Sequence, residues 1–124
     1  MIRLDTHVVV WLYAGELERF SPLAAAALEE EILVISPIVE LELTYLHEIG
    51  RLTVSGSVVV ADLRARLGLE ISEQSLSAVV AAASPLDWSR DPFDRLIVGD
   101  ALSASSPLLT KGETIRRRVS LARW

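Results

Sequence analysis

The sequence predicts an α/β fold in which helices cover a central, mainly parallel β-sheet. Short runs of apolar, often β-branched residues alternate along the chain with longer segments of helical character. Serine–proline and aspartate–proline pairs precede several of the longer segments, as is typical of helix starts, and glycine follows several others. Strands that alternate with helices in this way usually pair in parallel through helical crossovers.

The first half of the chain contains two predicted strands and three predicted helices. The apolar run Ile2–Asp5 is the first strand, and it leads into a helix over His7–Ala14. A proline in the first helical position, after a capping serine, begins the helix Pro22–Glu31. The β-branched run Ile32–Ile35 predicts a buried strand, and a second serine–proline start opens the helix Pro37–Ile49.

The second half repeats this alternation with shorter strands. Glycine or proline again marks helix ends, and Asp91-Pro92 opens the last long helix. The predicted elements are, in order, an extended connector at Arg51–Val54, a helix over Ser57–Leu67, a strand at Leu69–Ile71, a helix over Ser75–Ala83, a loop at Leu86–Arg90, a helix over Pro92–Ala104, a strand at Pro107–Thr110, a helical turn at Thr114–Arg118 and an edge strand at Val119–Ala122.

The composition favours a single domain over residues 1–124 and excludes several classes of protein. Apolar residues make up 51% of the 124 residues, which is too many for a disordered chain. No apolar run reaches the roughly 18–20 residues needed to span a bilayer, and no signal segment is recognisable at the start of the chain. The absence of cysteine excludes disulfides and thiolate chemistry, so we expect a cytoplasmic protein.

The charge is unevenly distributed along the chain. A net charge of −5 disfavours nucleic-acid binding by the surface as a whole. Acidic residues dominate up to Glu73, whereas Lys111, Arg116, Arg117 and Arg118 make the end of the chain basic. This basic stretch is either a solvated helix face or a local patch that contacts phosphates.

Acidic residues stand at strand ends and helix starts that are expected to meet at one edge of the sheet. Asp5 ends the first strand, whereas Glu42 and Asp94 lie in the first turns of their helices. Ligands of parallel α/β sheets bind at the carboxyl edge. Carboxylates gathered there repel one another unless a cation offsets them, and Mg²⁺ and Mn²⁺ prefer oxygen ligands. The pattern therefore predicts metal-dependent hydrolysis of phosphodiesters.

Purely structural interpretations compete with this one. Asp91 is a natural N-cap before proline, and Asp94 has the spacing of a capping box. Glu40 and Glu42 point to different faces of one helix, so only one of them is expected to be functional. His7 either orients Asp5 or lies on the surface, and the three tryptophans are more typical of packing than of base stacking.

Four blocks of the sequence resemble those of a known family. They are Leu4–His7, the stretch from Ile35 to Leu52, the block Arg90–Ile97 (Arg-Asp-Pro-Phe-Asp-Arg-Leu-Ile) and Pro107–Lys111. In this order they span essentially the whole chain, and the third block is the most specific. The chain resembles the PIN-domain ribonucleases, and most of all the toxin half of VapBC-type toxin–antitoxin modules. The resemblance implies a three-layer α/β/α PIN-like domain.

The resemblance also implies a function and a set of site residues. The family's first three acidic positions fall on Asp5, Glu42 and Asp94. They imply Mg²⁺ or Mn²⁺ held by these carboxylates, cleavage of RNA, a homodimer, and a VapB-like antitoxin whose C-terminal segment covers the active site. In such an endoribonuclease Lys111 would contact flanking phosphates, and Arg95 would either contact them or pair with a carboxylate of its own helix.

The sequence departs from the family pattern at one position. The family usually places a fourth aspartate where this chain has Gly112. Three interpretations remain open: Glu113 with Thr110 completes the site, Asp91 supplies the missing charge, or the site is weakened. The last interpretation leads to an alternative function, a non-catalytic PIN-fold module that binds RNA or the antitoxin.

Two other phosphate-handling classes fit less well. A receiver-type phosphoacceptor needs an acidic pair after its first strand and an aspartate after its central strand. A phosphatase with an aspartyl nucleophile needs a second aspartate two residues after the first. His7 stands at that position, and Ser72 follows the third predicted strand.

Overall fold

The computed structural model describes residues 1–124 and confirms a parallel α/β architecture. All five strands pair in parallel in the order β3-β2-β1-β4-β5. They are β1 (Ile2–Leu4), β2 (Leu33–Ile35), β3 (Glu70–Ile71), β4 (Leu108–Leu109) and β5 (Ala122–Arg123).

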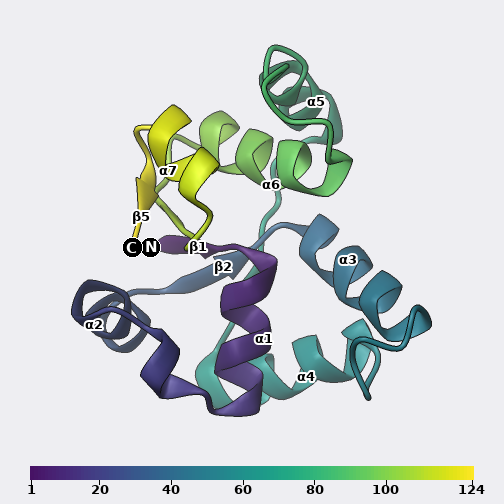
Figure 1. Ribbon diagram of the computed structural model, residues 1–124, viewed down its shortest axis with the longest axis vertical. Helices are drawn as coiled ribbons and strands as arrows, with labels where there is room; N and C mark the ends of the chain where they lie inside the picture. Colours follow the sequence, from purple (N-terminus) through teal and green to yellow (C-terminus); the bar gives the residue numbers. More distant parts are fainter.

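The helices cover both faces of this sheet. In Figure 1 the helices α5, α6 and α7 lie above the strands, and α1, α2 and α4 lie below them. Helix α3 contacts α4 and α6, one from each layer. The helices are α1 (Thr6–Ala14), α2 (Pro22–Glu30), α3 (Pro37–Glu48), α4 (Gly56–Leu67), α5 (Leu76–Ala83), α6 (Pro92–Ser103) and α7 (Glu113–Arg118), with a 3₁₀ turn η1 (Leu17–Arg19) after α1. None of them has the length and apolar character that crossing a bilayer requires.

Side-chain caps set where the predicted helices begin. Ser21 Oγ accepts the N–H of Ala24 at 3.0 Å, and Ser36 Oγ accepts the N–H of Ile38 at 3.1 Å. Each cap satisfies a backbone donor that the first helical turn leaves free. The proline that follows each serine is already suited to the first helical position. The predicted starts of α2 and α3 are therefore confirmed.

The strand order creates a crevice beside β1. From β1 the chain adds β2 and then β3 on one side, and it later crosses to the other side of β1 to form β4. At such a reversal the connections leave β1 and β4 in opposite directions, and in α/β sheets ligands usually bind beyond the carboxyl ends of such strands. Asp5 and Thr110 directly follow these two strands.

Two local features differ from the sequence-based prediction. The predicted final edge strand is present, but its predicted bounds Val119–Ala122 are wrong, because the strand covers Ala122–Arg123. Val119 is instead buried in the core, and its N–H closes α7 on the carbonyl of Ile115 at 2.8 Å. The 3₁₀ turn at Leu17–Arg19 was not predicted, because a segment of three residues is too short to show a periodic pattern of apolar residues.

A buried ion pair joins the sheet to α6. The Arg3 guanidinium donates to Asp100 at 2.7 Å through Nε and to Ser72 at 3.2 Å through a terminal nitrogen. Ser72 in turn donates to the second oxygen of Asp100 at 2.7 Å. All three side chains are buried. The network ties β1, the end of β3 and α6 together, and it thereby fixes the helix that carries Asp94.

Replacing Asp100 by asparagine should destabilise the protein strongly. The guanidinium of Arg3 would remain buried without a counter-charge, which typically costs about 3–5 kcal/mol. Urea unfolding followed by circular dichroism measures the loss. Asp62→Asn is the control, because Asp62 pairs with Arg66 on the exposed face of α4 and its loss should change little. Equal stability of the two variants would contradict this role of the network.

Candidate active site

Asp5 is the centre of the candidate site, and its carboxylate is held from two sides. Oδ1 accepts the N–H of Thr6 at 2.8 Å, so Asp5 is also the N-cap of α1. Oδ2 accepts the hydroxyl of Thr110 at 2.7 Å, which joins the ends of the adjacent strands β1 and β4. The side chain is buried. These two bonds fix the orientation of the carboxylate without neutralising its charge.

Glu42 reaches the same place from α3. Its Oε1 accepts a hydrogen bond from the Thr6 hydroxyl. Burial raises the pKa of Glu42 above its ordinary value, and the negative charges of Asp5 and Asp91 raise it further, while the bond from Thr6 opposes the rise. Glu42, rather than Glu40, is therefore the glutamate of α3 that lies near Asp5.

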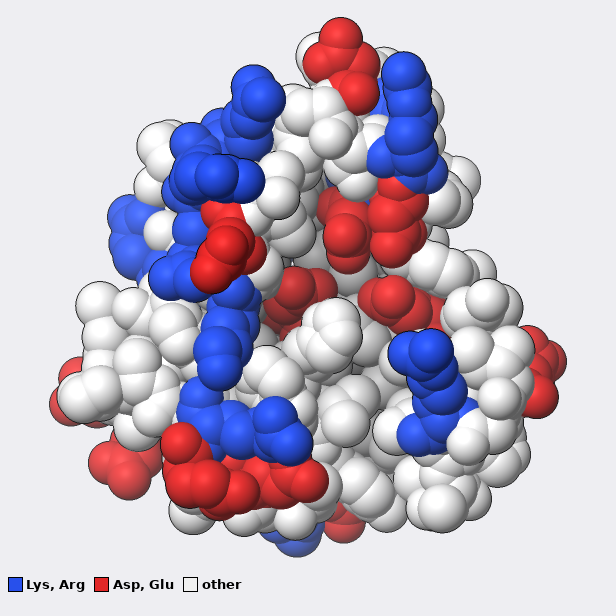
Figure 2. All heavy atoms as spheres, in the orientation of Figure 1, with Lys and Arg blue, Asp and Glu red and all other residues white.

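Asp94 completes the group from the first turn of α6. Burial raises the pKa of Asp94 to about 7, and the charges of Asp5, Asp91 and Glu42 add to the rise. The charges of these carboxylates therefore act on one another. Figure 2 shows acidic side chains inside a central hollow of the surface. The strand β1 and the helices α3 and α6 thus bring the predicted residues together.

The donor set fits a divalent cation that prefers oxygen. Asp5, Glu42 and Asp94 are mutually repelling carboxylates without an arginine or lysine bonded to any of them. No three acidic or histidine side chains stand close enough to ligate one ion in their present rotamers. Glu42 and Asp94 would therefore have to turn toward Asp5 when an ion binds. A cation there would relieve the repulsion that raises the pKa of Asp94.

The three residues predicted as accessory members of the site differ in how close they lie to its carboxylates. Thr110 is buried and bonded to Asp5. Asp91 caps α6 by accepting the N–H of Phe93 at 2.9 Å, as predicted, and it still lies close enough to raise the pKa of Asp94. Glu113 is exposed at the start of α7 and is not among the groups that shift the pKa of Glu42 or Asp94.

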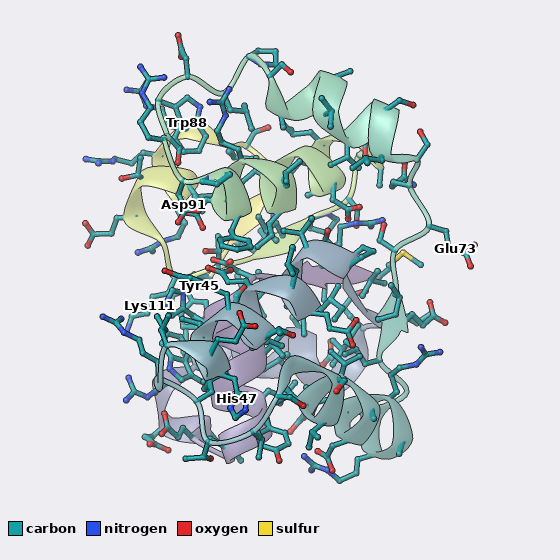
Figure 3. The ribbon with its side chains drawn as sticks, turned by 90° about the vertical axis from the view of Figure 1, so that its right-hand side faces the viewer. Tyr45, His47, Glu73, Trp88, Asp91 and Lys111 are labelled. Atoms are coloured by element: carbon teal, nitrogen blue, oxygen red, sulfur yellow. The ribbon has the colours of Figure 1, made fainter.

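The basic residues predicted to contact phosphates lie on the surface, with one exception. Lys111 and the three arginines of α7 are exposed. Figure 2 shows a stripe of basic side chains along one side of the acidic hollow, and Figure 3 shows Lys111 and Asp91 on the same side of the molecule. The expected pairing of Arg95 with a carboxylate of its own helix is wrong, whereas its contact with phosphates stays a prediction. Its guanidinium donates to the backbone carbonyls of Ser84 at 2.8 Å and Ala83 at 3.4 Å, where it closes the end of α5.

Thr6 is a site residue that the sequence-based reasoning missed. Its backbone N–H holds Asp5 and its hydroxyl holds Glu42, so one residue orients two carboxylates. Its position directly after Asp5 was the available signal, because the first residue of a helix presents an unpaired N–H to its cap.

The fold and the site together define a three-layer α/β/α protein with carboxylates gathered beyond the ends of β1 and β4. The chain belongs to the PIN-domain family, whose model matches residues 2–120. It is 30% identical over 119 residues to Ribonuclease VapC22 from Mycobacterium tuberculosis, a match that covers 93% of this chain and 89% of the relative.

Solved structures share the fold at lower identity. VapBC2 from Rickettsia felis, bound to a DNA fragment from its promoter, contains a chain that matches with a TM-score of 0.69 at 19% identity, over 98% of this chain and 96% of that one. VapBC-1 from nontypeable Haemophilus influenzae matches with a TM-score of 0.60 at 18% identity, over 100% of this chain and 96% of that one. The three-layer PIN fold expected from the sequence is therefore confirmed.

The raised pKa of Asp94 predicts that the metal-free protein loses stability as the pH rises from about 4 to about 7. In this window the folded protein keeps a proton that the unfolded chain has already released, so deprotonation favours unfolding. Asp94→Asn should weaken the dependence, leaving the part that the raised pKa of Glu42 contributes, and should raise the unfolding free energy at pH 8 by about 1–2 kcal/mol, a figure reduced for solvent screening.

Urea unfolding at several pH values with a chelator present measures this effect. Asp87→Asn, on an exposed loop, is the control and should follow the wild type. If Asp94→Asn shows the same pH dependence as the wild type, the carboxylate of Asp94 does not experience the repulsion described above.

Proposed function

We propose that this protein is a metal-dependent endoribonuclease and the toxin of a VapBC-type pair in the cytoplasm. One observation carries the proposal: Asp5, Glu42 and Asp94 come from the end of β1, from α3 and from α6, and burial, with the charges of Asp5, Asp91 and Glu42, raises the pKa of Asp94 to about 7. Membership of the PIN-domain family and the likeness to a protein named as a ribonuclease support the same chemistry.

In this proposal Asp5, Glu42 and Asp94 hold Mg²⁺ or Mn²⁺, with Thr6 and Thr110 keeping the carboxylates oriented. The ion, when bound, supplies positive charge beside the scissile phosphate. Glu42 also accepts the proton of the water that attacks the phosphodiester, since its raised pKa suits a general base. Lys111 and the arginines Arg116, Arg117 and Arg118 bind neighbouring phosphates of the RNA.

Glu42→Gln should reduce Mg²⁺- or Mn²⁺-dependent RNA cleavage by on the order of 100-fold, because the amide can neither accept the proton nor bind the cation as strongly. Single-turnover cleavage of a labelled RNA measures the effect. Glu40→Gln is the matched control, since it makes the same change two residues away on another face of α3. Equal residual cleavage by all three proteins would indicate a contaminating nuclease and would contradict the proposal.

A non-catalytic module that binds RNA or the antitoxin is the second candidate function. Gly112 favours it, because this glycine stands where the family usually has a fourth aspartate and the site therefore has less negative charge for a metal. Gly112 has ordinary backbone angles, and a Cβ there would lie 3.3 Å from the Thr110 hydroxyl, so a side chain fits with a small shift.

Gly112→Asp should therefore tighten Mn²⁺ binding by on the order of tenfold, because affinity for such ions rises with the charge of the ligands. Isothermal titration calorimetry measures it. The control is Gly112→Asn. Gly112 is the N-cap of α7 and offers no side-chain cap, and either new residue would supply one. Only aspartate adds charge, so equal affinities for Asp and Asn variants would mean that residue 112 lies outside the metal site.

The partners follow from the same proposal. The two matched structures are VapBC complexes, which supports a VapB-like antitoxin as the partner of this chain. We also propose a homodimer. Leu41 and Tyr45 of α3 and its C-cap residue Ile49 form an exposed apolar stripe, which a second copy would cover. Light scattering should give the mass of a dimer, and a monomer at micromolar concentration would contradict this part.

A further inference from the structure

An aromatic cluster lies beside the carboxylates. Trp11 of α1 packs edge-on against Phe20 and Trp124, with ring centroids 6.3 and 6.0 Å away. One helical turn earlier, the exposed ring of His7 lies with its centroid 5.9 Å from that of Trp11. Segments from both ends of the chain thus build one aromatic surface, on which Trp11 is only half-buried.

Two cations lie over the indole of Trp11. The Arg19 guanidinium carbon is 5.2 Å from the ring centroid, and the Lys111 ammonium is 5.8 Å away. Cations over an indole are attracted by its electron-rich face, so Trp11 holds both side chains near one position. Arg19 also pairs with Glu16, whereas Lys111 has no ion pair. Both cations remain exposed to solvent.

This cluster is continuous with the proposed active site. His7 follows Thr6, which bonds Glu42, and Lys111 follows Thr110, which bonds Asp5. The backbone therefore places one ring and one cation next to the two threonines that hold the carboxylates. In Figure 2 basic side chains run along the hollow that contains the acidic groups, so a polyanion lying in the hollow would meet them.

We propose that His7, Trp11, Arg19 and Lys111 form a subsite for one nucleotide of a single-stranded RNA, next to the bond that is cleaved. The nucleobase stacks on the exposed face of His7, and its phosphates contact Lys111 and Arg19, which Trp11 positions. The subsite rests on the proposed ribonuclease function. Aromatic rings with cations beside them are typical of single-strand binding, because only an unpaired base offers its face.

The observations favour RNA over an acidic peptide. A peptide carboxylate would pair with Lys111 and Arg19 but would leave the exposed ring of His7 unused. A nucleotide uses both features, because its base can stack on the ring while its phosphate pairs with the cations.

Binding of a 2′-O-methyl single-stranded oligoribonucleotide, which resists cleavage, tests the subsite in a chelator. Fluorescence anisotropy gives its dissociation constant for the wild type and for variants at exposed positions. Arg19→Ala and His7→Ala should each weaken binding about fivefold to tenfold. Arg66→Ala is the matched control, because Arg66 also forms an exposed ion pair within its own segment, on α4, and its loss should leave the affinity unchanged. A duplex of the same sequence should bind equally to the wild type and His7→Ala.

The outcomes separate this inference from the ribonuclease proposal. If RNA cleavage depends on Glu42 but the His7 and Arg19 variants bind the oligonucleotide like the wild type, the subsite is wrong and the ribonuclease stands. If cleavage does not depend on Glu42 but both variants bind more weakly, the subsite stands and the proposed reaction is wrong. Loss with Arg19→Ala alone would overturn base stacking on His7. Weakened binding of a VapB-like peptide with unchanged RNA affinity would overturn the choice of RNA.

Discussion

The hydrogen bond from Thr110 to Asp5 is the interaction on which the rest of the site depends. It joins the residues that follow β1 and β4, the two strands whose outgoing connections diverge. Thr6 holds the other oxygen of Asp5 and uses its hydroxyl to hold Glu42 from α3. A buried carboxylate fixed in this way cannot turn toward solvent. Its charge then adds to the effect of burial, which raises the pKa of the neighbouring Asp94 to about 7.

The arrangement of carboxylates that the proposed function needs lowers the stability of the folded protein. Burying carboxylates near one another without a counter-ion raises the free energy of the folded state at neutral pH. The protein compensates elsewhere, with the Arg3, Ser72 and Asp100 network and a continuous apolar core on both faces of the sheet. Gly99 lets α6 pack against α5, since a Cβ there would lie 2.7 Å from the Val79 carbonyl. Helix α6 is thus anchored at its centre while Asp94 faces the crevice.

Much of this fold follows from local sequence patterns. Caps before proline and short β-branched runs predicted the starts of α2, α3 and α6 and the positions of four strands, because such signals depend on neighbouring residues. The strand order and the pairing of Arg3 with Asp100 depend on residues 97 apart in the chain, which no local pattern encodes. Glu42 and Asp94 were predicted from their helix starts and the family blocks. The role of Thr6 and the contacts of Arg95 could not be predicted, because they depend on how the helices pack.

Anomalous diffraction from crystals soaked in Mn²⁺ tests the central claim most directly, because it locates the ion without relying on activity. We expect one or more Mn²⁺ peaks beside the ends of β1 and β4, with Asp5 and at least one of Glu42 and Asp94 as ligands at about 2.1–2.2 Å. Glu42 and Asp94 should have turned toward Asp5 from their present positions. Crystals at millimolar Mn²⁺ without a peak beside Asp5, or with the ion held elsewhere on the surface, would contradict a metal-dependent active site in this protein.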